Sequence, residues 1–351
     1  MKTSSRGDRL LALVLIAALA ACGGSDGSGG GTPQLPKNQW TWVDLPGTEC
    51  SDGSQTGIAV SPGDHADIVV FLDGGGACWD AITCFTAGTA KPGPYGRTQW
   101  ESQRDRELPG SLLDRALPGN PFSKDTLVFV PYCTGDVHAG DAVQSYPGAP
   151  RAWHHKGRVD VQKALDYIAA SLPAPGRLVV SGASAGGFGS LLAFDAFRRR
   201  FPSVKGYAVD DFGPLLVGND ISPVIRAAWF ASWRLDEVIL PLCPGCALDM
   251  SKLYPTLAKK YPDDRISLLS STRDLVIRSF FVLTPAQFEA AVRQLATEVI
   301  APLPNAKTFL VPGETHTMVG APQQFTSGGV PLVEWLRREV EDDPAWQSVG
   351  P

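Results

Sequence analysis

Histidine is scarce in this chain, with 5 residues among 351. His65, His138, His154 and His155 lie in the first half, and His316 stands alone near the C-terminal end. A structural zinc site needs four converging histidine, cysteine or carboxylate ligands, and the histidines and cysteines here are too scattered to indicate one. No metal or other cofactor is therefore expected.

The chain also lacks an excess of positive charge and an apolar run long enough to cross a bilayer. It carries 31 Lys and Arg against 36 Asp and Glu, a formal net charge of -5 at pH 7. This balance disfavours nucleic acid as a partner. The apolar run over residues 10–21 is too short for a membrane-spanning helix.

That short run instead has the layout of an export signal, because Lys2, Arg6 and Arg9 precede it and small residues follow. The sequence Leu19 to Cys22 resembles a bacterial lipobox, which implies cleavage before Cys22 and lipidation of its thiol. Loss of the signal removes three positive charges and one negative charge, so the net charge goes from -5 to -7.

We therefore expect three segments. Residues 1–21 are predicted to be a lipoprotein signal peptide, residues 22–38 a Gly- and Ser-rich flexible tether, and residues 39–345 a single catalytic domain. The expected protein is an exported bacterial lipoprotein that Cys22 anchors to a membrane, facing the periplasm or the cell exterior.

Six cysteines remain besides Cys22, and an even number in an exported chain predicts disulfides. Short separations favour local pairs, which leaves one long-range pair; the predicted bridges are Cys78 with Cys84, Cys243 with Cys246, and Cys50 with Cys133. Cys243-Pro244-Gly245-Cys246 is also similar to a thioredoxin-type redox motif, but no thioredoxin-like strand order surrounds it.

The most informative stretch runs from Leu178 to Leu192. An apolar strand-like segment meets a cluster of small residues and then a helical pattern, so the chain reverses sharply at Ser184. Gly182, Ser184 and Gly186 form a G-x-S-x-G motif, the nucleophile elbow that lifts a serine hydroxyl clear of a sheet. The amide of Ala185 would then face the carbonyl under attack.

The elements around the elbow alternate between strand-like and helical patterns. Strands are predicted at 40–45, 56–60, 66–72, 126–131, 178–180, 204–209, 265–269 and 308–311, and helices at 158–170, 185–197, 285–300 and 330–340. This order predicts an α/β-hydrolase-like fold, with a mostly parallel central sheet, helices on both faces and inserted loops over the active site.

Two other segments are predicted to lie at the same sheet edge as Ser184. Three glycines, Gly74 to Gly76, follow the strand at 66–72, and their backbone amides are candidates for an oxyanion hole. Residues 86–123 carry many Gly, Pro and charged residues with little periodicity, which predicts an insertion that acts as a lid or substrate wall.

A serine nucleophile needs a histidine base, and that histidine needs a carboxylate to orient it. Only His316 follows Ser184, as the order serine, acid, histidine of α/β-hydrolases requires. Asp274 is the favoured acid because it follows the penultimate strand. Asp210 and Asp211, after the strand that follows the elbow, remain alternatives.

These motifs together resemble the pectin acetylesterase and Notum family; the segments concerned are 71–79 with Cys84, 182–187, 210–213, 271–274 and His316. The resemblance implies a Ser-Asp-His carboxylesterase without a metal, with Ser184, Asp274 and His316 as the triad. It places the oxyanion hole at Gly75, Gly76 and Ala185. The chain departs from the family at Gly76, where relatives often carry a bulky aromatic, and in its cysteines outside Cys78 and Cys84.

The expected function is that of a serine carboxylesterase that removes O-acetyl groups from a polysaccharide such as pectin. One alternative is a lipase-like carboxylesterase for longer acyl esters, since the sequence does not reveal the depth of the acyl pocket. Another is a lipid-anchored glycan-binding protein that has the fold without the activity.

Overall fold

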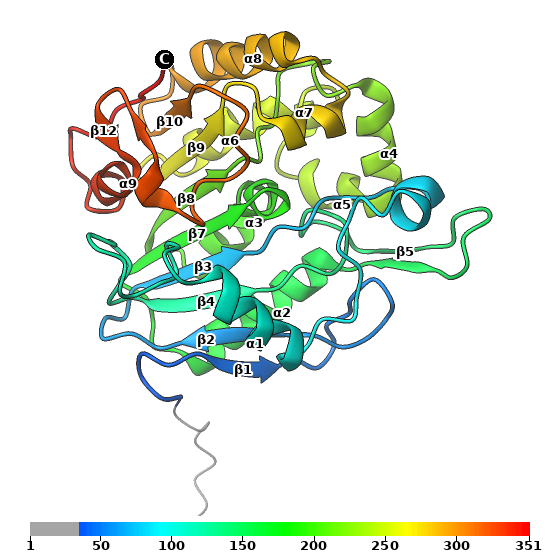
Figure 1. Ribbon diagram of the computed structural model, residues 1–351, viewed down its shortest axis with the longest axis horizontal. Helices are drawn as coiled ribbons and strands as arrows, with labels where there is room; N and C mark the ends of the chain where they lie inside the picture. Colours follow the sequence, from blue (N-terminus) through cyan, green and yellow to red (C-terminus); the bar gives the residue numbers. More distant parts are fainter. Residues whose placement is uncertain (1–34) are drawn as a thin grey trace, which may run out of the picture. The chain divides into compact units, whose positions relative to one another are not determined.

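An eight-stranded sheet runs through residues 35–351, the part of the chain that this computed structural model describes (Figure 1). The predicted signal peptide, Cys22 and the tether up to residue 34 lie outside the described residues. Residues 35–351 form a single unit. This unit runs past the expected domain end at 345, because Trp346 packs against Trp335 and Val349 donates to Thr308 O.

The strand order across the sheet is β1-β2-β4-β3-β7-β8-β9-β10. The first two strands are antiparallel to their neighbours, whereas β4, β3 and β7 to β10 all run parallel. The strands are β1 (Thr41–Asp44), β2 (Gly57–Ser61), β3 (Ile68–Leu72), β4 (Thr126–Val130), β7 (Arg177–Ala183), β8 (Lys205–Asp211), β9 (Arg265–Ser271) and β10 (Ala306–Val311).

Helices and two small hairpins connect these strands. The α-helices are α1 (Arg97–Glu107), α2 (Gly157–Ser171), α3 (Ala185–Arg200), α4 (Pro223–Trp233), α5 (Leu235–Ile239), α6 (Leu253–Lys260), α7 (Leu275–Phe281), α8 (Pro285–Gln294) and α9 (Leu332–Val340). Short helical turns are η1 (Ile82–Thr86), η2 (Pro244–Ala247), η3 (Met250–Lys252), η4 (Leu295–Ile300) and η5 (Pro322–Gln324). The hairpins pair β5 (Ala142–Gln144) with β6 (Trp153–His155) and β11 (Thr326–Ser327) with β12 (Val330–Pro331).

Both faces of the parallel strands are buried, which explains why their sequences are continuous apolar runs rather than alternating patterns. Val70 and Val180 belong to one core cluster, which α2 and α3 cover, and the adjacent Val69 and Val179 belong to the other, which α1 and α9 cover. Successive residues of a strand point to opposite faces, so each strand contributes to two cores.

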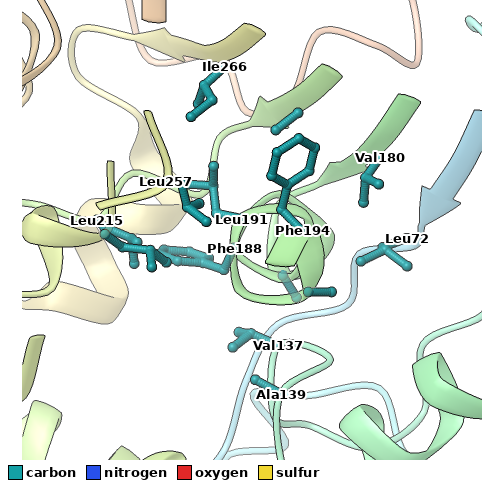
Figure 2. Close-up of a cluster of buried hydrophobic side chains, with 14 of the residues drawn as sticks. Leu72, Val137, Ala139, Val180, Phe188, Leu191, Phe194, Leu215, Leu257 and Ile266 are labelled. Carbon is teal, nitrogen blue, oxygen red and sulfur yellow. The ribbon is translucent and has the colours of Figure 1, made fainter. Parts of the chain in front are cut away.

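Helix α3 fills the centre of the first core (Figure 2). Its side chains Phe188, Leu191 and Phe194 lie among residues of the strands, including Val180 and Ile266. Full burial of such a side chain stabilises the folded state by about 1.5–3 kcal/mol. This packing fixes the helix that begins directly after Ser184.

The α/β-hydrolase-like fold predicted from the sequence is confirmed, and three differences are local. Residues 86–123 contain the helix α1, which the sequence analysis did not predict. Residues 223–239 lie outside the predicted helices and form two of them, α4 and α5, which are separate because Arg234 between them adopts a left-handed conformation with φ of 57°. The predicted helix 285–300 changes at Leu295 from α8 to the wider turn η4.

The three predicted disulfides are confirmed. Cys50 is bonded to Cys133 across 83 residues, and it joins the loop before β2 to the end of β4. Cys78 is bonded to Cys84 directly after the glycine loop, and Cys243 to Cys246 within one turn. A bridge over a long loop stabilises a fold mainly by restricting the unfolded chain.

Within residues 35–351 no single helix is long and apolar enough to cross a membrane. The segments Leu275–Phe281 and Pro285–Ile300 reach that length only together, with a bend of 94° between them. Phe281, Phe288 and Leu295 of this pair are buried in the first core.

Candidate active site

Ser184 occupies the sharp turn between β7 and α3. Its backbone is in an uncommon conformation, with φ of 58° and ψ of -117°, and its amide donates to Asp211 O at 2.7 Å. Such strain is retained only where the surrounding structure over-determines it. Ser184 is 9% exposed, and it lines two cavities at the carboxyl edge of the sheet.

The two glycines of the G-x-S-x-G motif are required by close backbone packing. A Cβ on Gly182 would overlap with Gly186 O, and a Cβ on Gly186 would overlap with the carbonyl oxygen of Leu72 at the end of β3. The elbow can therefore sit against β3 only with glycine at both positions. This contact brings Ser184 beside the glycine loop that follows β3.

His316 lies against Asp274, the acid that the sequence analysis favoured. Nδ1 of His316 lies 2.7 Å from Oδ2 of Asp274, which is completely buried. The other oxygen, Oδ1, caps α7 by accepting from the amides of Val276 and Ile277 at 2.7 and 3.0 Å. The carboxylate is thus held from both sides, and the imidazole receives a fixed orientation.

A second carboxylate near His316, that of Asp211, binds the backbone of the loop that carries His316. Its oxygens accept from the amides of Met318 at 3.0 and 3.1 Å and of Val319 at 3.1 Å. Burial raises the pKa of Asp211 to about 7, although those two amides act in the opposite direction. Asp211 therefore anchors the loop, whereas Asp274 contacts the imidazole.

Asp210 faces away from His316. Its carboxyl group accepts from the amide of Gly213 at 2.6 Å and from the hydroxyl of Tyr254 at 3.1 Å. Burial raises its pKa to about 8. Of the three acids considered from the sequence, only Asp274 makes a hydrogen bond with His316.

Ser184 and His316 line the same cavity. Within residues 35–351 no hydrogen bond joins the Ser184 hydroxyl to the imidazole. Catalytic hydrogen bonds are often long in the free enzyme and shorten when substrate binds. The arrangement therefore places a serine and a histidine at one cavity, with a buried carboxylate hydrogen-bonded to the histidine, in the order of a catalytic triad.

Two carbonyl groups of the glycine loop after β3 accept hydrogen bonds from neighbouring segments. Gly75 O accepts from the amide of Lys91 at 2.7 Å, and Gly76 O accepts from the hydroxyl of Tyr132 at 2.8 Å. In a trans peptide the N–H points opposite to the C=O, so the Gly76 N–H points away from Lys91. Both glycines line the cavity with Ser184.

Gly76, where the sequence analysis found a departure from the family pattern, is closely packed against the backbone of a neighbouring segment. Its φ is 77°, and a Cβ there would overlap with Thr89 O on the neighbouring segment. Gly76 also forms an antiparallel bridge with Ala90. A side chain cannot be accommodated unless the 89–91 segment moves.

A second loop, after β4, holds the glycine loop at both ends. Tyr132 accepts from the amide of Val137 at 2.9 Å while it donates to Gly76 O. His138 Nε2 lies 2.8 Å from Asp73 O, and burial lowers the pKa of His138 to about 4. The imidazole is therefore neutral near pH 7, and Nε2 carries the proton because its partner is a carbonyl.

This second loop is built around the buried carboxyl group of Asp136. Its oxygens accept from the Thr134 hydroxyl at 2.6 Å and from the amides of Gly157 and Gly140 at 2.7 and 3.2 Å. The contacts hold the chain where Val137 and His138 take positive φ values of 51° and 60°. This conformation of the second loop places Tyr132 and His138 in contact with the glycine loop, which carries the candidate oxyanion-hole amides.

The larger cavity beside Ser184 has a volume of about 380 Å³. His316 lies on its wall, together with the charged residues Asp73, Lys91 and Glu107. Leu112, from the 86–123 insertion, is among its apolar lining residues. The insertion is thus a wall of the cavity, one of the two roles predicted for it.

The smaller cavity has a volume of only about 20 Å³ and also opens at Ser184. Its aromatic lining consists of Phe188, Trp229, Phe280 and Phe281, and its remaining residues besides Ser184 are Gly76, Ala77, Val137, Ala185 and Ile277. A water molecule needs roughly 10–15 Å³ of such space, so the cavity holds about one methyl-sized group. Trp79 extends the aromatic cluster through Trp229 and Phe280.

The other histidines occupy structural positions. His154 Nδ1 contacts Glu49 Oε2 at 2.7 Å, and His155 is buried between Thr134 O and the Tyr146 hydroxyl. His65 is exposed beside Asp125. None of these three lines the larger or the smaller cavity.

The sequence predicted that the loop from Tyr132 to Gly140 lines a pocket and that the stretch 227–240 packs beside the site, but it gave no individual role to Tyr132 or to the four aromatic residues of the small cavity. Tyr132 directly follows a predicted strand at the active-site edge, and that position was the available signal. The aromatic residues come from α3, α4 and α7, which are far apart in the sequence.

A model of the pectinacetylesterase family matches residues 39–240, more than half of the chain. A palmitoleoyl-protein carboxylesterase NOTUM of Drosophila melanogaster is 26% identical over 221 residues, which cover 59% of this chain and 32% of that protein. Pectin acetylesterase 11 of Arabidopsis thaliana is 25% identical over 180 residues, which cover 50% of this chain and 45% of that protein. The matches thus span less than half of these relatives' lengths.

Among solved structures, the Wnt deacylase Notum from Drosophila superposes with a TM-score of 0.63. The alignment covers 86% of this chain and 93% of that chain at 20% sequence identity. At this identity the superposition establishes the shared fold.

Proposed function

The chain belongs to the pectinacetylesterase family, and we propose that it is a serine carboxylesterase that removes O-acetyl groups from a polysaccharide such as pectin. In this proposal Ser184 is the nucleophile, His316 the general base and Asp274 the residue that orients His316. The amides of Gly75, Gly76 and Ala185 form the oxyanion hole.

The proposed reaction proceeds through an acyl-enzyme. His316 takes the proton of the Ser184 hydroxyl, whose oxygen attacks the ester carbonyl, and the three amides stabilise the negative oxygen that develops. His316 then gives its proton to the departing sugar oxygen. Water, deprotonated by His316, attacks the acetyl-serine, and acetate leaves as the Ser184 hydroxyl is restored.

The observation that carries the acetyl assignment is the difference between the two cavities at Ser184. The leaving alcohol oxygen must lie beside His316 to receive its proton, and His316 lines the larger cavity but not the smaller one. The alcohol therefore belongs in the cavity of about 380 Å³, and the acyl group in the one of about 20 Å³. An acetyl methyl fits the smaller space.

A lipase-like esterase for longer acyl groups is the second candidate. The observation in its favour is the apolar part of the larger cavity, where Leu112, Leu113 and Phe129 contribute. This reading requires the acyl chain to lie on the His316 side. A non-catalytic glycan-binding protein of the same fold is the remaining alternative, and the Asp274–His316 hydrogen bond argues against it.

The test is acetate release from acetylated pectin and acetylated xylan by the purified protein, with Ser184→Ala as the control. Loss of Ser184 is expected to lower turnover by roughly 10⁶-fold, as for other serine hydrolases. Near-normal release by Ser184→Ala would reject the assignment of the nucleophile. Activity on neither polymer would favour the glycan-binding alternative.

We also propose that the protein is exported and anchored to a membrane through a lipid on Cys22. The support for export is the lipobox-like sequence and the three disulfides, which persist in oxidising compartments. Metabolic labelling with a radioactive fatty acid, compared between the wild type and Cys22→Ala, tests the anchor. Equal labelling of both proteins would reject it.

A further inference from the structure

A further cavity of about 470 Å³, called the second cavity below, adjoins the cavity that Ser184 and His316 line together. It is distinct from the small aromatic cavity. Lys91, Gln103 and Glu107 line both the second cavity and the cavity of Ser184 and His316, so these two cavities share one wall. Both volumes lie within the range of about 300–1,000 Å³ that is typical of ligand sites. Neither the proposed reaction nor the acetyl group needs this additional space.

The shared wall is held by the side-chain amide of Gln103. Nε2 donates to Asp73 Oδ2 at 3.1 Å and to Glu107 Oε2 at 2.7 Å, while Oε1 accepts from the Tyr95 hydroxyl at 2.6 Å. Gln103 is only 5% exposed. A polar network in which each member has a partner is rigid, so the wall is formed before a ligand arrives.

The charged groups of this wall reach the solvent inside the cavities. Lys91 Nζ lies 3.5 Å from Asp73 Oδ2, and its side chain is 48% exposed. Arg106 lines only the second cavity and is 68% exposed, with Glu107 as a distant partner at 3.9 Å. Two cations against one carboxylate give the second cavity a positive balance among its lining residues.

We propose that the second cavity is a subsite for a uronic-acid unit that adjoins the acetylated sugar in the same glycan chain. This inference rests on the proposed function, which places the acetylated sugar in the cavity beside Ser184. The next sugar of the chain then lies past the shared wall, where Arg106 and Lys91 bind its carboxylate. Charge-assisted hydrogen bonds of this kind are stronger than those between neutral groups.

The subsite predicts that the enzyme prefers a chain over a single sugar. We would measure kcat/KM for acetate release from O-acetylated mono-, di- and trigalacturonic acid, and from acetylated xylo-oligosaccharides of the same lengths. For the galacturonic acid series, kcat/KM is expected to rise from the monomer to the dimer. The neutral series lacks the carboxylate and is expected to show a smaller rise.

Arg106→Gln is the discriminating variant because this residue lines only the second cavity. It is expected to lower the dimer-to-monomer ratio of kcat/KM by about fivefold, the size of effect that a single exposed charged contact produces. Arg104→Gln, on the same helix but outside both cavities, is the matched control and should leave the ratio unchanged.

Three results would overturn the subsite. They are equal kcat/KM for monomer and dimer in the wild type, an unchanged ratio in Arg106→Gln, or an equal Arg106-dependent rise with the neutral oligosaccharides. Failure of the proposed function is a separate result, because the wild type would then release no acetate from the monomer, or Ser184→Ala would release it equally well.

Discussion

On one side of Ser184 four aromatic side chains leave about 20 Å³ of space, and no charged residue among the described ones lines it. On the other side the cavity measures about 380 Å³, and Asp73, Lys91 and Glu107 line it together with His316. The difference indicates two modes of selection. Under the proposed assignment, the acid portion of the ester is selected by volume, and the alcohol portion by polar contacts.

The proposed exclusion of longer acyl chains from the aromatic side has a physical reason. Protein interiors are close-packed, and forcing extra methylenes into such a region costs about 1–3 kcal/mol. On the polar side, by contrast, we expect hydroxyl-bearing ligands to replace the water that solvates Lys91 and Glu107. Variants of the site can therefore be grouped by their effect. Some should lower activity on every ester, and others should change selection on one side of Ser184 only.

Asp274→Asn should have the largest effect and should not distinguish the two sides. Asparagine cannot stabilise the imidazolium that forms at His316, and kcat is expected to fall by about 10⁴ for every ester. Initial rates with acetylated pectin and with an aryl acetate provide the measurement. Asp263→Asn, an exposed neighbour on the loop before β9, is the matched control. Unequal losses on the two substrates would contradict a role through His316.

Asp211→Asn, a change beside His316, should alter how the free energy of unfolding depends on pH. The pKa of Asp211 in the folded protein, about 7, lies above the ordinary value of 3.8, so the folded chain binds this proton more tightly than the unfolded chain. The resulting stabilisation is present below about pH 4 and is lost as the pH rises to about 7.

Asparagine does not titrate. Raising the pH from 4 to 8 should therefore lower the free energy of unfolding of the wild type, relative to that of Asp211→Asn, by up to about 4 kcal/mol. Urea denaturation of wild type and variant at both pH values provides the measurement. A difference that is independent of pH would show that Asp211 is ionised throughout this range. Asp263→Asn again serves as the control.

Tyr132→Phe tests the glycine loop, whose amides form the proposed oxyanion hole. Loss of the hydroxyl leaves Gly76 O and the Val137 amide without their partner, and the Gly76 amide is then less well positioned. We expect kcat to fall by about tenfold with little change in KM, less than for direct loss of an oxyanion donor. The decrease should be the same for all acyl lengths.

Tyr167→Phe is the control for this variant, since the Tyr167 hydroxyl makes no hydrogen bond within residues 35–351. Thermal unfolding of both variants separates a positioning effect from a general loss of stability. A larger KM with unchanged kcat in Tyr132→Phe would indicate that the residue contributes to substrate binding instead.

Phe280→Ala should alter selection of the acyl group alone. Phe280 is partly exposed, so its truncation enlarges the small cavity at less cost to the core than truncation of Phe281. The ratio of kcat/KM for a butyryl ester to that for an acetyl ester should rise by about tenfold. Phe85→Ala, which removes a partly buried aromatic outside both cavities, should leave the ratio unchanged.

The elbow, the sheet and two of the disulfides were accessible from sequence because each depends on local pattern or short spacing, and Cys50–Cys133 followed as the pair that remained. Gly182 and Gly186 flank Ser184 within five residues, and the apolar runs report strands that are buried on both faces. Helix α1 was not predicted, because only Trp100 and Gln103 of its residues are buried and its sequence therefore has no apolar stripe.

The geometry that decides specificity depends on contacts between distant segments. The Tyr132 hydroxyl reaches Gly76 O across 56 residues, and the Asp211 carboxyl reaches the Met318 amide across 107. The volume of the smaller cavity is set by side chains from three helices, α3, α4 and α7. No spacing rule relates these residues, so their roles follow only from the folded chain.

The most direct test of the two-sided site is the dependence of kcat/KM on acyl length, measured with aryl esters from acetyl to hexadecanoyl and with Ser184→Ala as background. We predict a maximum at acetyl and a decrease of at least about tenfold by butyryl. A maximum at octanoyl or longer would contradict this account, because the acyl chain would then have to occupy the larger cavity beside His316.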